Sequence, residues 1–97
     1  MFSSYVLESW QHKGLKKFFE TGSTAGIQFA HKERLKIILL RLNSAIDAAD
    51  MNTPGMRFHK LKGKLKEYYS VTVNGNRRVI YRFENQDAIL VNYIDYH

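Results

Sequence analysis

Five side chains in the second half of the chain have the chemistry that RNA cleavage needs. They are two histidines, a lysine, an arginine and a tyrosine: His59, Lys62, Arg78, Tyr96 and His97. Without a metal, a base must take the proton of the ribose 2′-hydroxyl, cations must stabilise the charge growing on the phosphate, and an acid must protonate the departing 5′ oxygen. Histidine suits acid or base work, and the planar guanidinium of arginine suits the phosphate. These residues are therefore a candidate catalytic set.

Each of these residues also has an ordinary structural explanation when it is taken alone. His59 can be a surface histidine, Lys62 one lysine of a solvated run, and Arg78 a cation that keeps a sheet soluble. Tyr96 can be an edge aromatic and His97 a loose chain end. Taken together, with three of them on or beside one predicted sheet face, the functional interpretation weighs as much as the structural one.

The charge of the chain favours a polyanionic partner. Fifteen Lys and Arg residues against nine Asp and Glu residues give a formal net charge of +6, and the segment 59–66 holds four lysines and no acid. On a domain this small such a balance favours nucleic acid, although net charge also serves solubility. We expect RNA contacts from five cations and one aromatic side chain: Lys60, Lys64, Lys66, Arg77, Arg82 and Tyr68.

Length and composition restrict the class of protein. The 97 residues, 44% of them apolar, fit one folded domain over 1–97. The chain has no cysteine, no zinc-ligand spacing among its four histidines and no glycine-rich phosphate loop, so we expect neither a metal nor a cofactor. Because no apolar run approaches about 18 residues and no signal-peptide pattern is evident, we also expect a cytoplasmic protein without membrane contact.

The first half of the chain is predicted to be mainly helical. Strand-like residues favour a first strand over 5–11, and apolar spacing favours a short helix over 14–20. A longer helix is expected over about 31–49, with one buried face at helical spacing. That face consists of Leu35, Ile38, Leu39, Leu42, Ile46 and Ala49. Ile37 and Leu40, on its other side, either pack on the first helix or await a partner, and we favour core packing.

The second half alternates apolar and polar residues, as strands do. The segment 74–76, with the sequence NGN, separates two such runs and is a strong hairpin signal. A two-residue turn would place Val71 opposite Arg78, whereas a three-residue loop places Val71 opposite Val79 and joins apolar to apolar. We therefore predict the three-residue loop, with Asn76 in the left-handed conformation that asparagine tolerates.

This pairing, which also sets Tyr69 opposite Tyr81, gives the sheet two different faces. The apolar face, which should cover the helices, carries Val71, Val79, Tyr69, Tyr81 and Phe83. The other face is polar and basic and carries Tyr68, Ser70, Thr72, Arg78 and Arg82. A last strand should follow over 88–95. Its register stays open: a three-residue loop at 85–87 puts Tyr96 on the Arg78 face, and a two-residue loop puts His97 there.

Five segments of the chain resemble one known family. Their sequences are HKGLKKFFETG (12–22), MNTPG (51–55), HKLKG (59–63), NGNRR (74–78) and DYH (95–97). In this order and spacing, over residues 7–97, the chain resembles the HigB branch of the RelE-like toxins. These are ribosome-dependent endoribonucleases of bacterial type II toxin–antitoxin pairs.

The resemblance implies a fold, an activity and partners. The fold would be α+β, with two helices packed on one face of an antiparallel β-sheet. The activity would be metal-independent cleavage of messenger RNA in the ribosomal A site, which inhibits translation, and a cognate helix-turn-helix antitoxin would silence it. The functional positions of the family fall on the candidate residues named above: His59, Lys62, Arg78, Tyr96 and His97.

The chain differs from the usual family pattern at four positions. Arg77 stands where tryptophan is usual, and Lys60 where proline is usual. Lys64 and Ile94 each replace a usual acid. The changes at Arg77 and Lys64 add positive charge near the candidate site. They leave the nuclease interpretation intact and bear on substrate preference and activity.

Two other functions fit parts of the sequence. A RelE-fold poison of a protein target such as DNA gyrase would not need the histidine and cation set. A non-catalytic RNA- or ribosome-binding module would use the basic sheet face, with Tyr68 for stacking, and would need no acid or base. A cleavage assay on translating ribosomes separates all three functions.

Overall fold

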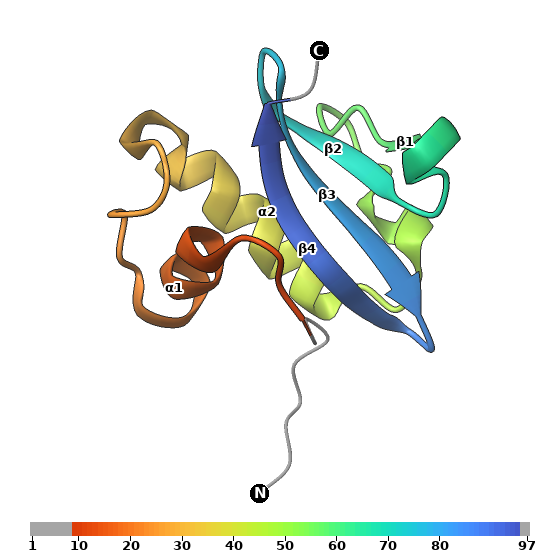
Figure 1. The fold of residues 1–97 in the computed structure, drawn as a ribbon, viewed down its shortest axis with the longest axis horizontal. Helices are drawn as coiled ribbons and strands as arrows, with labels where there is room; N and C mark the ends of the chain where they lie inside the picture. Colours follow the sequence, from red (N-terminus) through yellow and green to blue (C-terminus); the bar gives the residue numbers. More distant parts are fainter. Residues whose placement is uncertain (1–8, 96–97) are drawn as a thin grey trace, which may run out of the picture.

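The fold is a layer of two helices on one side of a four-stranded antiparallel sheet, in the order β1-β2-β3-β4 (Figure 1). This computed structural model describes residues 9–95. The helices are α1 (Lys13–Thr21) and α2 (Lys32–Ser44), with short 3-10 helices η1 (Phe29–His31), η2 (Ala48–Met51) and η3 (Gly63–Leu65). The strands are β1 (His59–Lys60), β2 (Tyr69–Asn74), β3 (Arg77–Glu84) and β4 (Asp87–Asp95). The predicted α+β class is confirmed.

The core lies between the helices and the sheet. The helices contribute Leu15, Leu35, Ile38, Leu39 and Leu42, and the strands contribute Val71, Val79, Tyr81 and Val91, all of them at most 1% exposed. The apolar face predicted for β2 and β3 therefore does cover the helices. Within residues 9–95, no helix is long and apolar enough to cross a membrane.

The short helix α1 has a clear beginning and end. The Nδ1 atom of His12 accepts a hydrogen bond of 2.9 Å from the backbone N–H of Leu15 and so caps the first turn. Gly22, with φ at +83°, ends the helix, and its N–H donates to the carbonyl of Phe18. The helix predicted over 14–20 is confirmed.

The predicted helix over 31–49 was too long. It ends at Ser44, and Asp47 begins the separate 3-10 helix η2 by accepting a hydrogen bond from the backbone N–H of Ala49. Ile46 is 65% exposed and Ala49 is exposed, so neither belongs to the buried face. The carboxylate of Asp50 accepts from the N–H of Ile46, and these local side-chain bonds compete with a continuing helix.

Two further predictions for the helical half need correction. Ile37 and Leu40 are 47% and 55% exposed, so they do not pack in the core. In the predicted strand over 5–11, the described part forms an isolated parallel bridge between Trp10 and Val91 of β4. The bridge has hydrogen bonds from Gln11 N–H to the carbonyl of Val91 and from Val91 N–H to the carbonyl of Ser9. Residues 5–8 lie outside the described part of the chain.

The hairpin register is the predicted one, but its turn is different. Val71 lies opposite Val79, and Tyr69 lies opposite Tyr81. The pairing shifts between Thr72 and Asn74, and Asn74 then lies opposite Arg77. The turn is therefore the two residues Gly75 and Asn76, and an irregularity at Val73 supplies the extra residue. Gly75, and not Asn76, has a positive φ, at +56°.

A second irregularity sets the end of β4. Asn85 and Gln86 form a two-residue turn with both φ angles positive, as a type I′ hairpin requires. The β3–β4 pairing then shifts between Ile80 and Arg82, where β4 has one extra residue and Leu90 has φ at +54°. This bulge brings Ile94 opposite Arg78, which is the pairing that a three-residue loop would have given. The predictions for Tyr96 and His97 fall outside the described residues.

Candidate active site

The sheet places two of the candidate residues on its open face, away from the helices. His59 on β1 lies opposite Ser70, and Arg78 on β3 lies opposite Thr72. Ser70 and Thr72 are two residues apart on β2 and therefore point to the same face. His59 and Arg78 consequently share the polar face that the sequence predicted, one from each side of β2.

A cavity of about 360 Å³ joins three of the five candidate catalytic residues. It is lined by His59, Lys60, Leu61, Lys62 and Arg78. Residues that carry an imidazole, an ammonium group and a guanidinium group thus line one cavity. The other two candidates, Tyr96 and His97, lie outside the residues that the structure describes.

The loop after β1 fixes the position of Lys62. Leu61 is 8% exposed, and its backbone N–H donates to the carbonyl of Tyr68 at 2.9 Å, which extends the β1–β2 pairing by one step. Gly63 follows with φ at +68°, a conformation that glycine adopts without steric cost. The chain then turns back through η3 to β2. Lys62 is therefore held between a buried anchor and a tight turn, with its side chain exposed.

A buried serine supports Arg78. The Nη1 atom of Arg78 donates to the hydroxyl of Ser70 at 3.4 Å, and Ser70 has no exposed surface. The Ser70 hydroxyl limits the orientations of the Arg78 guanidinium, while Arg78 still lines the cavity. Sequence reasoning placed Ser70 on this face but assigned it no role. The hairpin register, which puts Ser70 diagonally across from Arg78, was the signal for it.

Two of the predicted RNA-contacting lysines, Lys60 and Lys66, line a second cavity beside the first. It measures about 430 Å³ and is lined by Lys60, Leu61, Lys62, Gly63, Lys66 and Glu67. Lys64 is exposed on η3, and Tyr68 is half-buried. Lys60 also lies over the ring of Tyr69, with its Nζ atom 5.9 Å from the ring centroid. The lysine run is thus a largely basic rim that includes one acid.

The two remaining predicted contacts lie elsewhere. Arg77 lies opposite Asp95 on the other face of β3, and its guanidinium stands 5.1 Å from the ring centroid of Tyr93. Arg82 is on the Arg78 face but about 13 Å further along the strand, and it forms a 3.0 Å ion pair with Glu84. Neither residue lines the cavities described above, so RNA contact by either one stays a prediction.

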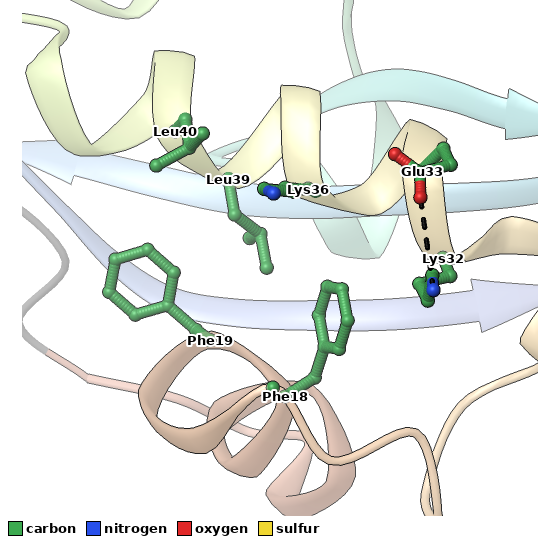
Figure 2. A pocket seen from close by; sticks show the side chains of 8 residues that line it. Phe18, Phe19, Lys32, Glu33, Lys36, Leu39 and Leu40 are labelled. Carbon is green, nitrogen blue, oxygen red and sulfur yellow. Dashed lines mark ion pairs between the residues drawn. The ribbon is translucent and has the colours of Figure 1, made fainter.

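A different hollow lies on the helical layer. Figure 2 shows Phe18 and Phe19 of α1 facing Leu39 and Leu40 of α2 across it, and its volume is about 330 Å³. None of the candidate catalytic residues within 9–95 lines this hollow. In the same described part of the chain, no three His, Cys, Asp or Glu side chains are grouped so that they could hold a metal ion.

Comparison with known proteins identifies the family of this chain. Residues 8–97 match the model of the HigB-like toxin family, described as the RelE-like toxin of type II toxin–antitoxin system HigB. A protein of Proteus vulgaris named Endoribonuclease HigB is 37% identical over 92 residues, which cover 95% of this chain and all of that protein. The chain therefore belongs to the HigB-like toxins, the RelE-like toxins of type II toxin–antitoxin systems.

Proposed function

We propose that this toxin is an endoribonuclease that cleaves messenger RNA in the ribosomal A site and so inhibits translation. The observation that carries the proposal is the cavity lined by His59, Lys62 and Arg78. Family membership supports the toxin role, and the name of the Proteus vulgaris relative supports cleavage of RNA. Because the proposed substrate is translated messenger RNA, the protein would act in the cytoplasm.

The cavity supplies the groups for attack by the 2′-hydroxyl on the neighbouring phosphate. Arg78, oriented by Ser70, would bind the non-bridging phosphate oxygens through its planar fork and stabilise the charge of the transition state. Lys62 would add a second positive charge at the same phosphate. His59 would move a proton, either from the 2′-hydroxyl or to the 5′ oxygen. Tyr96 and His97 stay predicted partners in this proton transfer.

The surroundings of the cavity fit a large anionic partner. Lys60, Lys64 and Lys66 are exposed along the rim. Such a rim would contact phosphates without reading their sequence, and binding to the ribosome would weaken as salt is raised. The family also implies a cognate antitoxin, which we propose is a small helix-turn-helix protein encoded beside the toxin.

The decisive experiment is cleavage on translating ribosomes. Purified toxin is added to ribosomes that are stalled on a defined messenger RNA, and the cut is mapped by primer extension. We expect a cut within the A-site codon that leaves a 2′,3′-cyclic phosphate. A matched messenger RNA with a 2′-deoxynucleotide at the cut position should resist cleavage, because the attacking hydroxyl is absent.

Each alternative function gives a different result in this assay. Binding to the ribosome with no cut would identify a non-catalytic ribosome-binding module. Neither binding nor cutting, by a protein that still arrests growth when it is expressed in cells, would point to a protein target such as DNA gyrase. Cutting of the 2′-deoxy message at the normal rate would contradict attack by the 2′-hydroxyl.

A further inference from the structure

Another cavity is lined by Arg78 but not by His59 or Lys62. Its volume is about 420 Å³, and it lies between α2, the loop before β1 and the β2–β3 hairpin. Its lining includes Arg34, Gly55, Arg57, Thr72, Gly75 and Arg78. Within residues 9–95 no Asp or Glu lines this cavity. Arg78 lines both this space and the candidate active site.

One wall of this cavity is held rigidly by Arg34. Its Nη2 atom donates to the carbonyl of Gly55 at 2.6 Å and to the carbonyl of Thr72 at 3.1 Å, and its Nε atom donates to the same Thr72 carbonyl at 3.3 Å. The backbone N–H of Thr72 in turn donates to the carbonyl of Met56 at 2.8 Å. These bonds join α2, the loop and β2, so the cavity has a fixed shape and a fixed positive charge.

The second cation, Arg57, is exposed and has an unusual backbone. Its φ is +49°, in the left-handed region that glycine occupies freely and that a long side chain occupies at a cost. Arg57 directly follows the tethered residue Met56, so the fold holds it at the mouth of the cavity. A costly conformation at a charged residue, beside two further arginines, is typical of a binding site.

We propose that this cavity binds a second phosphate of the RNA, adjacent along the strand to the phosphate that is cleaved. The inference rests on the proposed function, because the cleaved phosphate is the one bound by His59, Lys62 and Arg78. Arg57 would provide an exposed contact, Arg34 would contribute fixed charge, and Arg78 would lie between the two phosphates. The RNA strand would then cross the sheet face from the lysine rim to the turn of the β2–β3 hairpin.

The test compares short RNAs that differ by one phosphate. The probes are 2′-O-methyl oligonucleotides, which cannot be cleaved by their own 2′ oxygen: a dinucleotide with one phosphate and trinucleotides with two, extended on either side. Affinity is measured by NMR titration of the backbone amides at low salt. We expect one of the two trinucleotides, the one whose extra phosphate reaches the Arg57 cavity, to bind the wild-type protein about tenfold more tightly than the dinucleotide.

Variants of Arg57 separate a local contact from general charge. Arg57→Asn removes the cation and keeps a residue that tolerates positive φ, so it should fold and should reduce the tenfold gain to less than about twofold. Arg57→Lys keeps the charge but loses the planar fork, and should retain part of the gain. Lys17→Gln removes one charge from the exposed side of α1 and should leave the gain unchanged.

The proposal and the proposed function can fail separately. Two results would contradict the second phosphate site even where ribosomal cleavage is normal. One is that Arg57→Asn keeps the full tenfold preference for the trinucleotide. The other is that the wild-type protein, without inorganic phosphate, binds both oligonucleotides equally. If the wild-type protein cuts no message but Arg57→Asn still loses the gain, the site stands and the nuclease assignment is wrong. Saturating inorganic phosphate should compete with the trinucleotide extension more than with the dinucleotide.

Discussion

Neighbouring residues of β3 lie on opposite faces of the sheet, one in the core and one at the candidate active site. Val79 has no exposed surface and packs against the helical layer, whereas Arg78, the preceding residue, is half-exposed and lines two cavities on the opposite face. Side chains of a strand alternate between faces, so a step of one residue moves from the core to the site. The main core and the candidate active site thus lie on opposite faces of one sheet. Substitutions on the two faces should separate stability from activity.

The largest expected effect on activity is that of Arg78→Ala. Removing a group that stabilises transition-state charge costs on the order of a hundredfold in rate, or about 2.7 kcal/mol in activation free energy. The free energy of unfolding should change little, roughly within 1 kcal/mol, because the side chain is partly exposed and its bond to Ser70, at 3.4 Å, is long. The rate is measured on stalled ribosomes, and the stability by urea unfolding.

Arg78→Lys is the matched control, since it keeps the charge but not the fork. It should recover only part of the lost rate, because one ammonium group cannot bind two phosphate oxygens in parallel. Growth arrest as strong as that of the wild type by a well-expressed Arg78→Ala protein would remove Arg78 from the mechanism.

Deletion of His97 tests the part of the candidate set that comes from the sequence alone. If this imidazole is an acid or base, or orients Tyr96, its loss should reduce cleavage on the order of a hundredfold. We expect stability to be nearly unchanged. Cleavage and urea unfolding of the truncated protein are measured together. A wild-type rate would leave catalysis to His59, Lys62 and Arg78, and failure to fold would show a structural terminus.

Val79→Ala is the counterpart on the buried face. Loss of two methyl groups from a fully buried site should lower the free energy of unfolding by roughly 2 kcal/mol. The rate of cleavage per folded molecule should stay within about twofold of wild type, because the substitution touches neither cavity. If the rate falls as far as it does for Arg78→Ala, the two faces of β3 do not separate stability from activity.

How far the sequence predicts this fold depends on whether the determining contacts are local. The β2–β3 register followed from alternation, because only one pairing buries Val71 and Val79 together. The end of α2 was missed because the apolar spacing continues to Ile46, while Asp47 and Asp50 bind nearby N–H groups and stop the helix. The bulge at Leu90 was missed because it lies where Ser9 attaches: the N–H of Leu90 donates to the Ser9 hydroxyl across 81 positions.

The same distinction applies to the candidate site. His59, Lys62 and Arg78 were predicted to act together from their chemistry and from the family resemblance, and the structure brings them to one cavity. Arg34 and Arg57 were not singled out, because an arginine on a helix and another after a loop gave no pattern in the sequence. The tertiary bonds of Arg34 to Gly55 and Thr72 bring Arg34 to the hairpin, and the loop before β1 brings Arg57 to the same cavity.

The smallest predicted effect is on the pH dependence of stability, through His12. This residue caps α1 on the helical side, and its Nδ1 atom can accept from Leu15 only while that nitrogen carries no proton. Burial, with a further contribution from the charge of Arg77, lowers the pKa of His12 below its ordinary value. The folded protein therefore takes up this proton less readily than the unfolded chain does.

The sign of the effect follows from that difference in proton uptake. The stability that neutral His12 provides is complete above the unfolded pKa of about 6.5. It is lost progressively as the pH falls from there through the lowered pKa of the folded state. His12→Asn keeps an oxygen that can accept from Leu15 but cannot titrate, so its free energy of unfolding should fall less than that of the wild type between pH 7.5 and pH 5.5. Urea unfolding at both pH values measures the difference. Equal losses in the two proteins would mean that His12 does not couple the helical layer to pH, and that other groups carry the pH dependence.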